Sequence, residues 1–240
     1  MKKLIVSTAA LAISAGFALA DGHGKTVRLG TEGAYAPWNF LNDDGEVDGF
    51  ERELGDELCK RAELKCEWVT NEWDSIIPNL VSGNYDAIIA GMSITDERDE
   101  VIDFTQNYTP PDPSAYAAMS ADVDPASGIV AAQATTIQAA FVAEQGWTLV
   151  EFATPEETVA AVKNGEADAV LADKSFLDTM VGSDGLVMLE RMEQIGGGVG
   201  MGIRESDGEL RAMFDKAIQS MKDDGSLNTM IAKWEVASQF

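Results

Sequence analysis

The sequence predicts an α/β protein of two lobes with a cleft between them. Strand-like apolar segments alternate with helical segments, an order typical of βαβ units and a parallel sheet. A proline-rich break at 109–113 and a glycine-rich break at 196–202 interrupt this alternation. Two α/β units joined by two breaks indicate lobes that close around a ligand by hinge movement.

The first residues are typical of a secretory signal peptide. Lys2 and Lys3 precede an apolar stretch at 4–20 that ends in small residues, and we expect cleavage after Ala20. A membrane anchor is the alternative, but the stretch is shorter than the ~20 residues that a spanning helix needs. We therefore expect residues 1–20 to be removed and the mature chain to be exported and soluble.

The elements of the first unit follow from apolar runs and from helical periodicity. The expected strands are 27–30, 66–69 and 87–90, and the expected helices are 50–61 and 75–81. A loop at 31–40, rich in glycine, proline and aromatic residues, leads to a turn at 42–45.

The same pattern restarts after the proline-rich break. The expected strands are 129–132 and 167–171, and the expected helices are 156–163, 174–180, 210–221 and 227–234. Proline cannot continue a central strand, so the break at 109–113 is a candidate hinge. We expect residues 21–110 and 196–240 to form the first lobe and residues 111–195 to form the second.

The net charge of −24 limits the partners of the chain. Nucleic acids and anionic membranes attract basic patches, so we expect neither as a partner. The charge weakly favours a cationic ligand. We favour the simpler explanation, an acidic surface that only confers solubility, because a global charge says little about one site.

Cys59 and Cys66 form an even pair in a chain expected to be exported, which indicates a disulfide. On one continuous helix they would lie about 10 Å apart along the axis, which is too far to bridge. We therefore expect the helix to end between them. Metal binding is the alternative, but the only histidine, His23, lies near the mature N-terminus. We predict no metal site.

Several motifs occur in order along the first half of the chain. They are GTEGAYAPWNF at 30–40, GFE at 49–51, WDSIIP at 73–78, GNYDA at 83–87, MSITDER at 92–98 and DFT at 103–105. The sequence thereby resembles the bacterial periplasmic receptors for polar amino acids, especially the branch that binds lysine, arginine, ornithine, histidine and opines. Cys59 and Cys66 also stand where the basic-amino-acid branch carries its disulfide.

The resemblance implies a type II periplasmic binding protein fold, with the ligand cleft between two lobes joined by two hinge strands. It also implies a periplasmic monomer that needs no cofactor. Such a protein captures an L-amino acid and passes it to the membrane permease subunits of an ABC importer.

An α-amino acid carries a carboxylate and an ammonium on one carbon, so its receptor needs a fixed cation and a fixed anion. Arg98 can hold the carboxylate through its planar fork of donors, and Ser93 offers a hydroxyl beside it. Asp173 stands where the family keeps its ammonium-binding aspartate. The alternatives are an exposed helix arginine for Arg98 and a helix N-cap for Asp173.

The resemblance implies a carboxylate-binding turn in the second lobe, at 133–136. The family's glycine is Ala134 here, which matters if that position requires a positive φ. We expect Thr136 to contact the ligand. The family's paired serines are Ala90 and Gly91, so only their backbone groups can act.

Glu32, Tyr35 and Trp73 are the candidates for the far end of the ligand. Tyr35 and Trp73 resemble the aromatic faces that enclose the ligand side chain, and Glu32 resembles the carboxylate that binds a distal cation. Ion pairing and cation–π attraction suit a guanidinium or ammonium tail. The alternatives are core packing for the aromatic residues and a solvated loop position for Glu32. Trp38 fits either role.

We therefore predict capture of a cationic L-amino acid: arginine, lysine, ornithine or an arginine-derived opine. Glutamine, histidine or another polar amino acid is the nearest alternative. An enzyme on the same scaffold, such as a dehydratase or a lytic enzyme, is more remote, because we expect no catalytic residue. The sensor domain of a receptor is a further alternative, but it would need a transmembrane segment, and we expect none.

Overall fold

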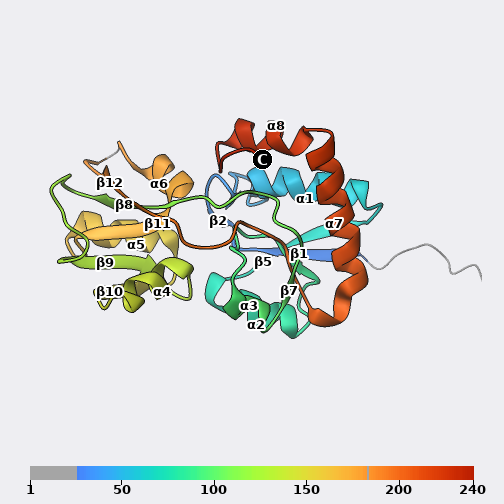
Figure 1. Ribbon diagram of the computed structural model, residues 1–240, viewed down its shortest axis with the longest axis horizontal. Helices are drawn as coiled ribbons and strands as arrows, with labels where there is room; N and C mark the ends of the chain where they lie inside the picture. The colour runs from blue at the N-terminus through green and yellow to red at the C-terminus, as the bar shows by residue number, and fades with distance from the viewer. Residues whose placement is uncertain (1–25, 183) are drawn as a thin grey trace, which may run out of the picture.

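Two separate sheets, each covered by helices, form the two lobes of the protein (Figure 1). The structure is a computed structural model, and it describes residues 26–182 and 184–240. The expected signal peptide, its cleavage after Ala20, and His23 lie outside the described residues. Within them, no helix is long and apolar enough to cross a membrane.

The first sheet has the strand order β5-β1-β6-β13-β7. Its strands are β1 (Val27–Thr31), β5 (Cys66–Thr70), β6 (Ala87–Ile88), β7 (Asp103–Phe104) and β13 (Gly202–Ile203). Strand β1 pairs in parallel with β5 and β6, while β13 is antiparallel to both of its neighbours.

Helices cover both faces of this first sheet. They are α1 (Phe50–Arg61), α2 (Ile76–Val81), α3 (Asp96–Asp99), α7 (Gly208–Asp223) and α8 (Ser226–Trp234). Leu29 of β1 packs with apolar residues of α1, α7 and α8, whereas Ile88 of β6 packs with residues of α2 on the other face. Figure 1 shows α1 and α8 on one side of the sheet and α2 on the other.

The second sheet has the order β10-β9-β11-β8-β12. Its strands are β8 (Ser114–Ala118), β9 (Ile129–Gln133), β10 (Thr148–Phe152), β11 (Ala169–Asp173) and β12 (Val187–Glu193), and its helices are α4 (Ile137–Glu144), α5 (Pro155–Asn164) and α6 (Lys174–Met180). Strand β9 is parallel to β10 and β11. Helices α5 and α6 share one hydrophobic cluster, and α4 packs in another.

Two chain segments connect the lobes, one between β7 and β8 and the other between β12 and β13 (Figure 1). They are hydrogen-bonded to each other: Tyr108 N donates to Val199 O at 2.8 Å, and Val199 N donates to Thr109 O at 3.3 Å. The predicted lobe boundaries fall within these two segments. The division at those residues stays a prediction.

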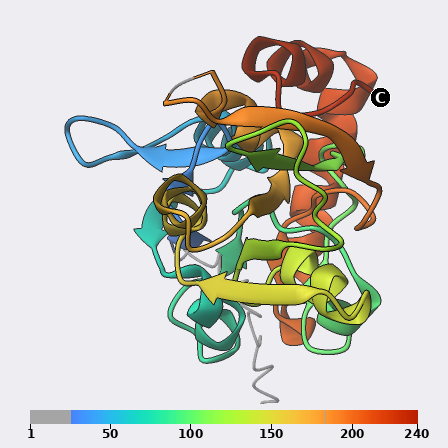
Figure 2. The ribbon, with the colours of Figure 1, turned by 90° about the vertical axis from the view of Figure 1, so that its left-hand side faces the viewer.

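The predicted loop at 31–40 is partly wrong. It contains β2 (Ala34–Tyr35) and the start of β3 (Asn39–Leu41), which form a small antiparallel sheet with β4 (Val47–Asp48). Figure 2 shows the β3–β4 hairpin projecting from the body of the protein. Strands this short carry too few alternating residues for a periodicity signal.

The other differences concern element ends and elements that the sequence pattern missed. Strand β6 ends at Ile88, earlier than predicted, and α2 begins at Ile76, after a 3₁₀ turn at Trp73–Ser75. Strand β11 runs from Ala169 to Asp173, two residues later than predicted, so Asp173 is its last residue. The missed elements include β8, β10, β12 and α4.

The predicted disulfide joins Cys59 to Cys66, with the two Cα atoms 6.2 Å apart. Helix α1 ends at Arg61 and β5 begins at Cys66, so the chain turns between the two cysteines as required. The disulfide closes a short loop between the last turn of α1 and an edge strand of the first sheet, which stabilises the fold by about 2 kcal/mol.

Candidate functional site

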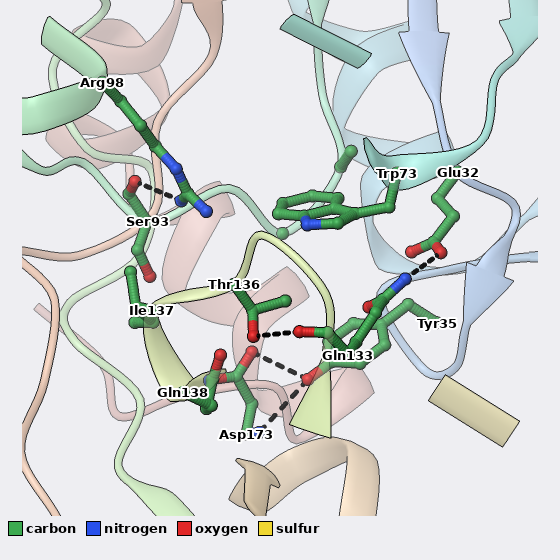
Figure 3. A pocket seen from close by; sticks show the side chains of 12 residues that line it. Glu32, Tyr35, Trp73, Ser93, Arg98, Gln133, Thr136, Ile137, Gln138 and Asp173 are labelled. Carbon is green, nitrogen blue, oxygen red and sulfur yellow. Dashed lines mark hydrogen bonds between the residues drawn. The ribbon is translucent and has the colours of Figure 1, made fainter. Parts of the chain in front are cut away.

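A cavity lies between the two lobes and is lined by residues of both. Its lining combines all nine residues predicted from the sequence with three that were not predicted (Figure 3). The lining residues are Glu32, Tyr35, Trp73, Ala90, Gly91, Ser93, Arg98, Gln133, Thr136, Ile137, Gln138 and Asp173.

The fold explains why these residues meet. Glu32 directly follows β1, Gln133 ends β9 and Asp173 ends β11. These are carboxyl ends of parallel strands, where open α/β sheets form their ligand crevices. Thr136 is the N-cap of α4, whose first turn supplies Ile137 and Gln138. Each lobe therefore presents the same kind of edge to the cavity.

Arg98, on α3, is the cation of the cavity. Its Nη1 donates to Ser93 O at 2.9 Å, its Nη2 donates to Thr135 O of the other lobe at 3.3 Å, and its guanidinium lies 5.3 Å from the centre of the Trp73 ring. Burial lowers the pKa of Arg98 to about 10, which still leaves it charged at neutral pH.

Within the described residues, Arg98 has no carboxylate at salt-bridge distance. Every other arginine has one: Arg28, Arg52, Arg61, Arg191, Arg204 and Arg211. A desolvated charge without a partner is costly. Arg98 is therefore suited to an anion that enters from outside the protein.

Among the carboxylates, the Asp173 charge has the largest effect on Arg98, where it raises the pKa against burial. Its carboxylate accepts from Tyr35 OH at 2.9 Å and from Gln138 Nε2 at 2.8 Å. Burial raises the pKa of Asp173 to about 7, and the Asp112 carboxylate adds to the rise. Asp173 occupies the N-cap position of α6, as the alternative expected, but its side chain makes no capping hydrogen bond.

Tyr35 reaches across from the first lobe to the second. Besides donating to the Asp173 carboxylate, its hydroxyl accepts from Asp173 N at 3.1 Å. Its ring stacks on Phe176 of α6, with centroids 4.7 Å apart. Trp38 also spans the lobes, because its Nε1 donates to Ser175 Oγ at 2.8 Å. Trp38 is buried and does not line the cavity, which settles its role as core.

Glu32 provides a second carboxylate, bonded to Gln133 of the opposite lobe. Gln133 Nε2 donates to Glu32 Oε1 at 2.6 Å and to Ala153 O at 3.0 Å. Burial raises the pKa of Glu32 to about 7. Figure 3 shows Glu32 and Arg98 on opposite sides of Trp73. The cavity thus has a cation on one side of this ring and a carboxylate on the other.

Trp73 has a double role. Its side chain is only 8% exposed and packs in a hydrophobic cluster with Ile76 and Leu80, yet it also lines the cavity. The core-packing alternative and the lining role are therefore both correct for this residue. A tryptophan fixed by its core side offers the cavity a rigid face.

The turn before α4 shows whether Ala134, which replaces the family glycine, has to adopt a positive φ. The positive φ in this turn belongs to Thr135, at 60°, and Ala134 has none. Replacing the family glycine by Ala134 therefore causes no left-handed strain at that position. Thr136 Oγ1 donates to Gln133 O at 2.7 Å and accepts from Ala139 N at 3.2 Å. Its hydroxyl orders the turn and the helix start.

The sequence analysis did not predict three of the lining residues, Gln133, Ile137 and Gln138. Residues 137–144 are largely apolar without a clear stripe, so periodicity did not reveal α4. Thr136 as an N-cap was the available signal, since a helix after it places the next residues beside the cap. Among the described residues, no group of three or more His, Cys, Asp or Glu side chains could hold a metal ion.

A two-lobed α/β protein whose lobes share one polar cavity belongs to the class of periplasmic binding proteins. The chain is a member of the family described as bacterial extracellular solute-binding proteins, family 3, whose model matches residues 27–237. It is therefore a solute-binding protein, as its resemblance to that class predicted.

The relatives agree with this assignment. The lysine/arginine/ornithine-binding periplasmic protein of Escherichia coli is 32% identical over 228 residues, covering 88% of this chain and 87% of its own. A periplasmic His/Glu/Gln/Arg/opine family-binding protein from Silicibacter pomeroyi, solved in complex with lysine, is 69% identical. Its TM-score is 0.87, over 90% of this chain and 100% of that chain, which confirms the predicted type II fold.

One solved relative concerns catalysis on this scaffold. It is an ancestral amino acid-binding protein described as a precursor of cyclohexadienyl dehydratase, 27% identical with a TM-score of 0.78. The match covers 87% of this chain and 94% of that chain.

The raised pKa of Asp173 makes a prediction about stability without ligand. Its pKa rises from about 3.9 in an unfolded chain to about 7 here, so the folded state holds the proton more tightly. The free energy of unfolding therefore falls as the pH rises from about 4 to about 7. Asp173→Asn removes this dependence, so wild type should lose about 2 kcal/mol more than the variant between pH 5 and pH 8. Urea unfolding at the two pH values measures this, and identical losses contradict the assignment.

Proposed function

We propose that the protein captures a cationic L-amino acid and delivers it to the permease subunits of an ABC importer. The candidate ligands are arginine, lysine, ornithine and arginine-derived opines. The proposal rests on Arg98, which has no carboxylate at salt-bridge distance among the described residues and lines one cavity with the Asp173 and Glu32 carboxylates. The lysine bound to the Silicibacter pomeroyi relative supports it.

Each charged group of the ligand has a matching group in the cavity. The α-carboxylate suits the two terminal nitrogens of Arg98, which a carboxylate can bind in parallel. The α-ammonium suits the Asp173 carboxylate, and the distal cation suits Glu32. The aliphatic chain between these charges would lie along Trp73 and Tyr35, whose rings attract cations.

The electrostatics of the empty cavity favour a ligand with net positive charge. Asp173 and Glu32 both have a pKa of about 7, so at neutral pH each carboxylate is partly protonated when no ligand cation is bound. A nearby cation favours the ionised carboxylate and lowers the pKa. The ligand therefore restores charge pairing that burial has weakened.

Two other readings have less support. Glutamine or histidine satisfies Arg98 and Asp173 but offers Glu32 no permanent cation. An enzymatic role needs a group that attacks or protonates the substrate. Glu32, with a pKa of about 7, can protonate a substrate, but Arg98 and Asp173 form a clamp that recognises an α-amino acid without attacking it. We propose capture without catalysis by a periplasmic monomer whose signal peptide is cleaved after Ala20.

Arg98→Ala should abolish amino-acid binding while the protein stays folded. Two charge-assisted hydrogen bonds are lost, so the affinity for L-lysine and L-arginine should fall by at least about a hundredfold. Titration calorimetry measures the affinity and circular dichroism measures the fold.

Arg52→Ala is the matched control for this change. Arg52 also lies over a tryptophan, 5.7 Å from the centre of the Trp68 ring, and pairs with Asp56 outside the cavity. Its removal should leave ligand affinity unchanged. A folded Arg98→Ala protein with wild-type affinity would sink the assignment of the carboxylate site.

Glu32→Gln tests the class of ligand. The amide keeps the size of the side chain and can still accept the hydrogen bond from Gln133, but it removes the negative charge. Affinity for arginine and lysine should fall about ten- to a hundredfold, while any neutral amino acid that binds should be affected much less. Parallel calorimetric titrations with L-arginine, L-lysine and L-glutamine give the comparison.

Glu156→Gln is the control for the Glu32 experiment. The Glu156 charge acts on Glu32, but its side chain is exposed and does not line the cavity. Its neutralisation should change affinities by less than about threefold, because exposed charges are screened. An equal loss for charged and neutral ligands in Glu32→Gln would mean that Glu32 only shapes its loop. Wild-type preference for glutamine would also contradict the cationic reading.

A further inference from the structure

Glu51 is a carboxylate buried in the first lobe, outside the cavity. It lies in the first turn of α1 and is 0% exposed, between the core residues Phe50 and Leu54 along that helix. A helix N-terminus favours an acidic side chain, but an exposed position would give the same benefit. Burial of an ionisable group is costly unless hydrogen bonds compensate for it. Its partners therefore indicate why a carboxylate is present.

Three donors converge on this carboxylate. Gly91 N donates to Glu51 Oε1 at 2.6 Å, Tyr108 OH donates to the same oxygen, and Asn39 Nδ2 donates to Oε2 at 2.7 Å. The amide orientation of Asn39 follows from its other contact, because Gly33 N donates to Asn39 Oδ1 at 2.7 Å. The nitrogen of that amide must then face Glu51. The Gly91 N–H and the Asn39 amide nitrogen can only donate, and the Tyr108 hydroxyl donates here, so the carboxylate supplies the acceptor for all three.

These donors belong to segments that build the ligand cavity. Gly91 lines the cavity itself, at φ +62°. Asn39 is the register partner of Tyr35 in the β2–β3 pair and holds Gly33, the residue that follows Glu32. Tyr108 lies in the first of the two segments that connect the lobes. One buried carboxylate thus ties the cavity wall to the Glu32–Tyr35 segment and to the interlobe connection.

The Gly91 contact also affects the chemistry of the cavity. The N–H of Gly91 is committed to Glu51, so it is not available to bind a ligand carboxylate. The Gly91 backbone also lies close to Tyr35, because a Cβ built on Gly91 would be 3.6 Å from the Tyr35 ring. A displaced Gly91 would therefore disturb Tyr35 as well as the cavity wall.

We propose that Glu51 is a positioning residue for ligand binding: it holds Gly91 directly, and the Glu32–Tyr35 segment through Asn39, in the binding geometry. Glu51 contacts no ligand in this proposal and acts only through these partners. The inference rests on the proposed function, since the segments it places are those assigned to the amino acid.

Exchanging the carboxylate of Glu51 and the amide of Asn39 between the two positions distinguishes a positioning role of Glu51 from simple packing. In Glu51→Gln, one acceptor becomes a donor that opposes the donors of Asn39 or of Gly91. In the double variant Glu51→Gln/Asn39→Asp, the new amide can donate to the new carboxylate at position 39. That carboxylate can still accept from Gly33 N, and the amide oxygen at position 51 can still accept from Gly91 N. The double variant thus restores every link to the cavity with nearly unchanged volume.

The test measures affinity by calorimetry with L-lysine, L-arginine and L-glutamine, using the amino acid that wild type binds most tightly. Glu51→Gln should weaken binding by at least about tenfold, and the double variant should return to within about threefold of wild type. Amide hydrogen exchange should show lost protection at Gly91 or Gly33 in the single variant and its recovery in the double variant.

Tyr85→Phe controls for stability alone. It removes a buried hydroxyl of the same lobe, which donates to Ile76 O and does not touch Glu51. It should lower the melting temperature without changing affinity. A Glu51→Gln protein that binds within about threefold of wild type overturns the inference. A folded double variant that binds as weakly as Glu51→Gln also overturns it. If Glu51→Gln does not fold, the double variant is compared with wild type instead, and a folded double variant that binds at least about tenfold more weakly than wild type overturns the inference. Wild-type preference for glutamine contradicts the cationic ligand and leaves the Glu51 comparison intact.

Discussion

The burial of charged groups that form no salt bridge with one another, in the interlobe cavity, is the constraint on which the rest of the structure depends. Burial shifts the pKa of Arg98 down to about 10 and the pKa values of Asp173 and Glu32 up to about 7. Loss of water is the largest cause in both directions, since it disfavours each charged form. A ligand that carries a carboxylate, an α-ammonium and a distal cation supplies every missing partner. We infer that the ligand completes the electrostatics of the fold.

The two lobes bring these groups together by the same architectural means. The carboxyl ends of parallel strands in the two sheets present Glu32, Gln133 and Asp173 to one crevice. Hydrogen bonds from Tyr35 to Asp173 and from Gln133 to Glu32 join the lobes through residues that also line the cavity. The side chains that join the lobes are therefore also those that we propose for ligand capture, and the paired connections at Tyr108 and Val199 lie between the same two lobes.

The sequence predicted the two-lobed fold and the placement of all nine candidate residues around one cavity, while their binding roles stay predictions. The fold was predictable from long periodic segments such as α1, and the site from motifs that occur in a recognisable order along the chain, such as Ser93 to Arg98. Periodicity failed where elements are short, as in β2 and β3, or largely apolar without a clear stripe, as in α4. Gln133 and Gln138 were missed because their roles depend on carboxylates distant in sequence. Glu51 illustrates the same limit, since its partners come from three separate segments.

The central claim is that the cavity recognises a distal positive charge. Titration of wild type with L-arginine and with L-citrulline tests it most directly, because citrulline replaces the guanidinium by a neutral group of similar shape. Desolvated charge-assisted hydrogen bonds contribute about 1.5–3 kcal/mol, so arginine should bind at least about tenfold more tightly. Equal affinities for the two amino acids, or tighter binding of citrulline, would contradict the account.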